Sequence, residues 1–278
     1  MAVNFSKKPH ILVVHGVQTG DDSDITSDQQ IKMLVDKSLS GIEMETDYKV
    51  SGFFYENIND KSQTFYQFFF KAIFGGNPLV GKVLKEVVDA AGDVVTAAKG
   101  NSTAAKIRKK LREQILKSYK SGNQLIIVAH SLGTIYALDV ICELMASSHY
   151  FKGDDIKTWP VQGYVSMGSP LGLDLNILGL PVFVKRNIET LSAETNVFPW
   201  HNYFNRLDPV VSGNVFGKPI FVDDSKGPVE KRYGDDAMMA KWLLQGHAVT
   251  SGNQWIFAHT AYWRNPKIGD LLVNMLWD

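Results

Sequence analysis

A serine between small and apolar residues is the first candidate for chemistry in this sequence. Ser131 lies in the segment 129–133, AHSLG, directly after the apolar run 125–129, LIIVA. A nucleophilic serine on a tight strand-to-helix turn needs small residues two positions before and two positions after it. Here these are Ala129 and Gly133, so alanine replaces one of the two usual glycines. The pattern predicts a nucleophile for acyl transfer, and a serine that only caps a helix is the alternative.

The segment 13–17, VVHGV, contains the second group that acyl transfer requires. Negative charge develops on the substrate oxygen in the transition state, and rigid backbone N–H groups stabilise it. We expect one donor from Leu132, at the start of the helix after the turn. The second is expected from Val17, because Gly16 lets the chain turn sharply after a strand. A tight turn without function is the alternative for this His-Gly pair.

A histidine near the end of the chain is the expected general base. In proteins with this type of serine turn, the acid and then the histidine follow the serine along the chain. His259 lies in a loop just before the last predicted helix, from which it can reach Ser131. His247 is the second choice, and His201 lies ahead of the favoured acid. The order and spacing exclude the remaining histidines, which are His10, His15, His130 and His149.

Asp208 is the favoured partner of this histidine. It is followed by Pro209, which lacks a backbone N–H and therefore ends a strand ladder, so Asp208 is expected on the loop beyond the strand end. There its carboxylate would fix the histidine tautomer and stabilise the protonated imidazole. Asp223 and Asp224 are alternatives, and an Asp-Pro turn without a catalytic role is another.

The elements that would position these residues follow an alternating pattern. Short apolar runs alternate with amphipathic segments, which predicts βα units on a mostly parallel central sheet flanked by helices. Strands are expected at 11–14, 48–55, 125–129, 161–167, about 201–206 and 219–222. Helices are expected from about Ser27, after 101–103, after 129–133, and over 268–277.

One stretch does not follow the alternation. We expect a single domain over residues 1–278, with a cap- or lid-like insertion at about 60–100. Its phenylalanines favour a substrate with a hydrophobic acyl chain, or contact with a lipid surface, although packing in a core would explain them equally well. Lysines and a Gly-Gly pair interrupt the stretch, so it is not a transmembrane segment. The phenylalanines are Phe65, Phe68, Phe69, Phe70 and Phe74.

Composition narrows the possible classes of protein. The 278 residues include 29 Lys and Arg and 29 Asp and Glu, so the net charge of zero offers no basic surface for nucleic acid. Cys142 is the single cysteine, which excludes an intrachain disulfide and a Cys-rich metal site. The sequence contains neither a nucleotide-binding glycine motif nor an H-E-x-x-H zinc motif.

The beginning of the chain carries no visible secretion signal. Its apolar run, Ile11–Val14, is shorter than the roughly 7–15 apolar residues of a cleavable signal. Cytoplasmic localisation is therefore the default expectation, and signal-independent export stays open. The sequence indicates no oligomeric state.

Taken together, these motifs resemble those of the α/β-hydrolase superfamily, and within it those of lipase-like and esterase-like members. The resemblance lies in HGV at 15–17, AHSLG at 129–133, GSP at 168–170 and HTAYW at 259–263, while 56–100 and 171–200 have no counterpart. It implies ester hydrolysis through Ser131, His259 and Asp208 by way of an acyl-enzyme, without a cofactor. Thioesterase, peptidase and acyltransferase activity, or a non-catalytic binding module, stay as alternatives, because this fold hosts many functions.

Overall fold

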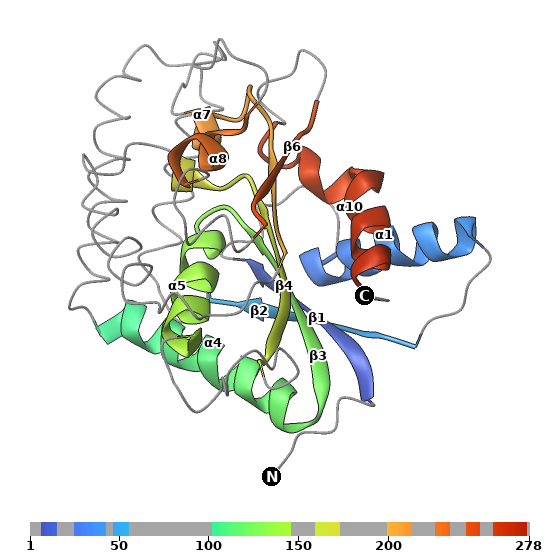
Figure 1. Cartoon of the computed structure of the whole chain (residues 1–278), viewed down its shortest axis with the longest axis vertical. Helices are drawn as coiled ribbons and strands as arrows, with labels where there is room; N and C mark the ends of the chain where they lie inside the picture. Colours follow the sequence, from blue (N-terminus) through green and yellow to red (C-terminus); the bar gives the residue numbers. More distant parts are fainter. Residues whose placement is uncertain are drawn as a thin grey trace.

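A six-stranded parallel sheet forms the centre of the computed structural model (Figure 1). The strand order is β2-β1-β3-β4-β5-β6, and every neighbouring pair runs parallel. The strands are β1 (Lys7–His15), β2 (Lys49–Phe54), β3 (Asn123–His130), β4 (Val161–Met167), β5 (Trp200–Phe204) and β6 (Gln245–Ala248). The structure describes residues 7–15, 25–42, 47–55, 102–145, 159–172, 199–212, 226–233, 243–250 and 258–276.

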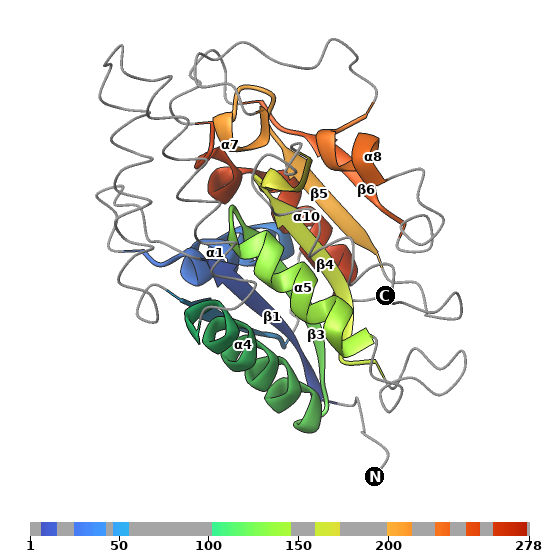
Figure 2. The ribbon, with the colours of Figure 1, turned by 90° about the vertical axis from the view of Figure 1, so that its left-hand side faces the viewer.

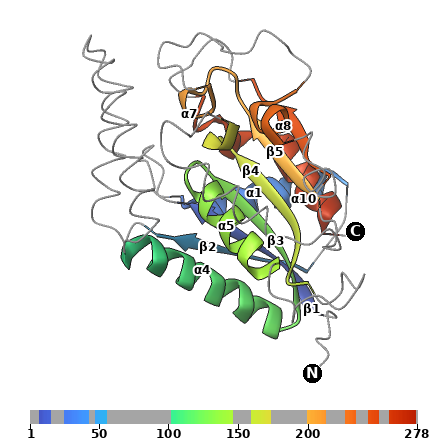
Figure 3. The same cartoon turned by 60° about the vertical axis from the view of Figure 1, so that its left-hand side comes forward.

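Helices cover both faces of the sheet, so the predicted α/β class with a parallel sheet flanked by helices is confirmed. Helices α4 (Ser102–Lys120) and α5 (Gly133–Met145) lie on one face, as Figures 2 and 3 show from the side of α5. Helices α1 (Ser27–Gly41) and α10 (Pro266–Met275) lie against each other on the other face (Figure 1). The short elements are η3 (Pro170–Gly172), α7 (Pro209–Ser212), α8 (Pro228–Tyr233) and η6 (Ala261–Arg264).

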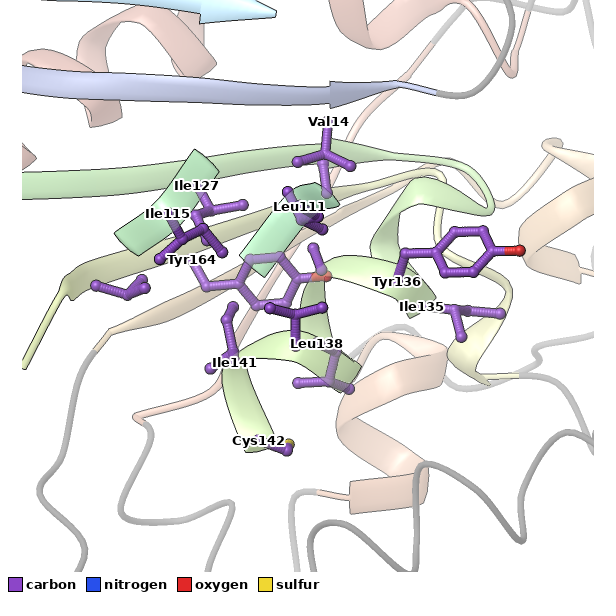
Figure 4. Packing of buried hydrophobic residues seen from close by; sticks show 14 of the residues in the cluster. Val14, Leu111, Ile115, Ile127, Ile135, Tyr136, Leu138, Ile141, Cys142 and Tyr164 are labelled. Carbon is purple, nitrogen blue, oxygen red and sulfur yellow. The ribbon is translucent and has the colours of Figure 1, made fainter. Parts of the chain in front are cut away.

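The core has two layers, one on each side of the sheet. Alternate strand residues point to opposite faces, so Val14 and Ile127 belong to the layer under α4 and α5, whereas Val13 and Val128 belong to the other. Figure 4 shows the first layer, in which Ile127 lies among apolar side chains of both helices. Because helices cover both faces, the strands carry continuous apolar runs in place of an alternating pattern.

The carboxyl ends of three neighbouring strands lie at one edge of the sheet. In the register of the pairs, His130 at the end of β3 is opposite Met167 at the end of β4, and Met167 is opposite Tyr203 on β5. Ligands of parallel α/β sheets bind outside this edge. The loops that follow β3, β4 and β5 therefore start side by side where a site is expected.

Most predicted elements occur within a few residues of their expected bounds. The helix expected over 268–277 is α10, which begins and ends two residues earlier. Strand β6 was not predicted, because its four residues include a glycine and no β-branched or large aromatic residue. The proposed insertion at 60–100 and the strand at 219–222 lie outside the described residues. Within the described part of the chain, no helix has both the length and the apolar character that crossing a membrane requires.

Candidate active site

Ser131 lies on a strained turn between β3 and α5. Its φ angle is 55°, in the left-handed region that side-chain-bearing residues rarely adopt. Its N–H donates to the carbonyl oxygen of Met167, 3.0 Å away, so the turn is attached to the end of β4. A strained conformation at a polar residue is an observation that favours a functional role, because the fold must stabilise it from outside.

Gly133 explains why the residue two positions after Ser131 must be small. A Cβ atom at this position would lie 2.7 Å from the carbonyl oxygen of Val14 on β1. Backbone atoms of a central strand cannot move away at low cost, so only glycine fits. The close approach brings the start of α5 to the end of β1, as the sequence pattern requires for such a turn.

His259 and Asp208 meet at the same edge of the sheet. The Nδ1 atom of His259 lies 3.0 Å from Oδ1 and 2.9 Å from Oδ2 of Asp208. Both side chains are buried, with 4% of His259 and none of Asp208 exposed. Because a carboxylate only accepts hydrogen bonds, the imidazole proton is on Nδ1, and Nε2 carries the lone pair. An imidazole in this tautomer can accept a proton at Nε2.

Asp208 is fixed by two further donors. The hydroxyl group of Tyr262 donates to Oδ2 at 2.8 Å, and the N–H of Val210 donates to Oδ1 at 2.9 Å. Burial and the neighbouring carboxylate raise the pKa of Tyr262 well above its ordinary value, so the phenol keeps its proton and remains a donor. The bond from Val210 is also a cap of the short α7, so Asp208 serves an Asp-Pro turn and the histidine together. The role of Tyr262 was not predicted from the sequence.

Gly168, which follows β4, allows this group to pack closely. Its φ angle is +56°, and its N–H donates to the carbonyl oxygen of Tyr203 at 3.1 Å. A Cβ atom here would lie 2.9 Å from Cε2 of Tyr262, 3.1 Å from Oδ2 of Asp208 and 3.2 Å from Cε1 of His259. The GSP motif therefore contributes its glycine to the site, because any larger residue at this position would crowd these three side chains.

Two further histidines pack behind His259. Nε2 of His130 donates to the backbone carbonyl of His259 at 2.8 Å, and the two rings lie 4.5 Å apart. The ring of His15 lies 5.0 Å from that of His130. Burial lowers the pKa of His15 to about 3 and that of His130 well below its ordinary value, so both rings are neutral. His259 therefore packs against uncharged imidazole, and neither neighbour competes with it as a base.

The alternative histidines lie elsewhere on the sheet. Nδ1 of His201 on β5 and Nε2 of His247 on β6 are 2.9 Å apart and form a hydrogen bond. The His247 ring also stacks on Tyr203, with 4.7 Å between centroids. Since β6 is the edge strand, three strands from β3, the structure brings His259 and not His247 to Asp208.

Of the remaining predicted site residues, the structure describes Leu132 and does not describe the other three. Leu132 is the first residue after Ser131, and its carbonyl accepts from Ile135 at 3.1 Å in the first turn of α5. Its N–H group is thus at the positive end of that helix. Val17, Asp223 and Asp224 lie outside the described residues. Within the described ranges, no three His, Cys, Asp or Glu side chains are grouped so that they could hold a metal ion.

The strand order and the sharp turn after β3 give the chain a parallel α/β architecture with a strained serine between a strand and a helix. No family model matches the sequence, and no curated protein matches it. Among solved structures, the chain is similar to Est1E from Butyrivibrio proteoclasticus, with a TM-score of 0.39 and 8% identity over 98% of this chain and 90% of that one. It is also similar to the thermophilic esterase Est2 from Thermogutta terrifontis, with a TM-score of 0.38 and 10% identity over 100% and 84%. Likeness at this level carries no conclusion about activity.

Proposed function

We propose that this chain is a serine hydrolase that cleaves carboxylic esters through a covalent acyl-enzyme. Ser131 is the nucleophile, His259 the general base and Asp208 the acid that orients it. The observation that carries the proposal is the buried bidentate contact between His259 Nδ1 and Asp208, beside the strained turn of Ser131. A buried carboxylate with an imidazole partner next to a strained serine is an arrangement suited to nucleophilic catalysis.

In the proposed first step, His259 Nε2 takes the hydroxyl proton of Ser131 as the oxygen attacks the ester carbonyl. The carbonyl carbon becomes tetrahedral and its oxygen becomes negative. The N–H groups of Leu132 and Val17 are proposed to stabilise this oxygen. Protonated His259 then gives its proton to the leaving alcohol, and the C–O bond to that alcohol breaks.

In the second step, water attacks the acyl group on Ser131. His259 accepts a proton from this water and returns one to the serine oxygen as the acid product leaves. The carboxylate of Asp208 is proposed to stabilise the imidazolium that forms twice in the cycle. The neutral rings of His15 and His130 support this role, because a second positive charge beside His259 would oppose its protonation.

Labelling with a fluorophosphonate tests the nucleophile. We expect the wild-type chain to be labelled and Ser131→Ala to be unlabelled under the same conditions. Equal labelling of the two would remove Ser131 from the mechanism. His259→Ala should lower the rate of nitrophenyl acetate hydrolysis by about 10³-fold or more. His247→Ala is the control, and a loss there as large as in His259→Ala would contradict the choice of base.

Substrate preference is the finer part of the proposal. We propose a hydrophobic acyl ester, including a lipid ester, on the basis of the phenylalanines at 65–74. A series of nitrophenyl esters of increasing acyl length should give maximal kcat/KM beyond acetate. A maximum at acetate with no turnover of longer chains would contradict this preference. The same series with thioesters, amides and added alcohol acceptors separates ester hydrolysis from thioesterase, peptidase and acyltransferase activity.

A further inference from the structure

Two buried hydroxyl groups connect the serine turn to the loop after β4. The hydroxyl of Thr134, in the first turn of α5, lies 2.6 Å from the carbonyl oxygen of Ser131. The hydroxyl of Ser169, in the GSP motif, lies 2.8 Å from that of Thr134. Thr134 is fully buried and Ser169 is 1% exposed, so water does not compete for these bonds.

The direction of the hydrogen bonds follows from the chemistry of the groups. A carbonyl oxygen cannot donate, so the single hydroxyl proton of Thr134 points to Ser131. Ser169 must then donate its own proton to Thr134 Oγ1. Ser169 Oγ in turn accepts from the N–H of Leu171 at 3.3 Å. The result is one directed chain, from the Leu171 amide through two hydroxyl groups to the carbonyl of Ser131.

Thr134 is held from its backbone as well. Its N–H donates to the Ser131 carbonyl at 3.0 Å, and its own carbonyl accepts from the hydroxyl of Tyr164 at 2.7 Å. Tyr164 is on β4, and its ring lies beside Leu138 and Ile141 of α5 (Figure 4). Burial raises the pKa of Tyr164 well above the ordinary value, so its hydroxyl stays a donor. A threonine hydroxyl that bonds the carbonyl three residues earlier is common at helix starts. The additional feature here is that Ser169, from the loop after β4, donates a hydrogen bond to the Thr134 hydroxyl.

We infer that Thr134 and Ser169 are positioning residues for Ser131 and, if the proposed function holds, for its nucleophilic oxygen. Ser131 is held at a φ angle of 55°, which an isolated serine does not favour. Both bonds to its carbonyl come from Thr134, and Ser169 fixes the hydroxyl that makes the shorter one. The chain thereby connects the orientation of Ser131 to the β4 end, the same loop that places Gly168 against His259 and Asp208.

Four variants test the inference: Thr134→Val, Thr134→Ser, Ser169→Ala, and the double variant Thr134→Val/Ser169→Ala. Thr134→Val keeps the shape and removes the donor, whereas Thr134→Ser keeps the donor. We expect Thr134→Val and Ser169→Ala each to lower kcat for nitrophenyl acetate by about tenfold, because small displacements of a reacting atom have effects of this order. KM should change less than twofold, and Thr134→Ser should keep kcat within twofold of wild type.

The double variant separates positioning from a general loss of packing. If Ser169 acts through Thr134, removing both should cost no more kcat than Thr134→Val alone. Ser166→Ala is the matched control. Ser166 is also buried on the β4 side and hydrogen-bonded, to Asn202 and Trp200, but has no bond to the serine turn, so its kcat should stay within twofold. Losses that multiply in the double variant, or an equal loss in Thr134→Ser, would overturn the inference.

Crystal structures of Thr134→Val and Ser169→Ala test whether this hydrogen-bonded chain holds Ser131, independently of any activity. We expect Ser131 to leave its left-handed conformation or to show two conformers in both variants. A single Ser131 conformer with φ near 55° in both would overturn the inference, even if fluorophosphonate never labels the wild type. Absence of labelling in the wild type, by contrast, counts against the proposed function alone.

Discussion

Replacing Gly168 by alanine perturbs the site through a single added methyl group. That Cβ would lie 2.9 Å from the ring of Tyr262 and 3.1 Å from Oδ2 of Asp208, where ordinary contacts are about 3.5 Å or longer. The left-handed φ of +56° adds strain of about 1–2 kcal/mol for a residue with a Cβ. We therefore expect the free energy of unfolding to fall by about 2 kcal/mol, from strain and crowding together.

The activity of this variant should fall more than its stability explains. Relief of the crowding must move the Asp208 carboxylate or the His259 ring by a few tenths of an ångström, and displacements of that kind lower kcat by about 10- to 100-fold. The assay is kcat for nitrophenyl acetate at a temperature where urea titration shows the variant fully folded. Gly41→Ala is the matched control, because a Cβ there meets nothing within 4 Å, and both its stability and kcat should be unchanged or slightly improved. A wild-type kcat in folded Gly168→Ala would refute the claim that Gly168 allows Asp208 and His259 to take their positions.

Three further predictions follow from the same region and from buried histidines elsewhere. Tyr262→Phe removes the hydroxyl that donates to Asp208 and accepts from the N–H of Asn205, so the free energy of unfolding should fall by about 1–3 kcal/mol, and a wild-type urea midpoint would contradict this. His130→Gln can still donate to the carbonyl of His259, whereas His130→Phe cannot, so kcat should be retained better in the former; equal kcat values would argue against a role for this bond. Lowering the pH should destabilise the fold, since burial lowers the pKa of several histidines below the unfolded value of 6.5. The unfolded chain then binds more protons, so stability is complete above pH 6.5 and is lost as pH falls toward 4. The histidines with a lowered pKa are His10 (pKa about 4), His15 (pKa about 3) and His201 (pKa about 4). Urea midpoints measured at pH 7.5 and at pH 5 check this prediction, and equal midpoints would contradict it.

The fold was predictable because its signals are local. Continuous apolar runs predicted β1 and β3, and a periodic apolar face predicted α1, whose Ile31, Val35 and Leu39 are indeed buried. The edge strand β6 was not predicted from the sequence, because its pairing with β5, and not the β-propensity of its residues, determines its conformation.

The candidate site was predictable only in part. Chain order and turn chemistry pointed to Ser131, Asp208 and His259, and the structure brings the last two into contact. The supporting roles of Tyr262, which lies within the HTAYW motif, and of Thr134 could not be predicted from the sequence. Their roles arise from contacts between segments far apart in the chain, and a buried tyrosine or threonine has no sequence signature of its own. Gly168 was noticed as part of a motif, but its purpose depends on three side chains that only folding brings near it.

The site contains two features that the fold itself does not require. A serine with a left-handed backbone is strained, and a fully buried carboxylate loses its hydration, so each lowers stability unless the surroundings compensate. Here the compensation is specific: two bonds from Thr134 hold the serine carbonyl, and three different groups donate to Asp208. If the turn served structure alone, glycine at position 131 would adopt the left-handed conformation without strain. An apolar residue in place of Asp208 would likewise avoid the cost of burying a carboxylate. That both features occur at the carboxyl edge of the same three strands favours selection for chemistry over selection for stability.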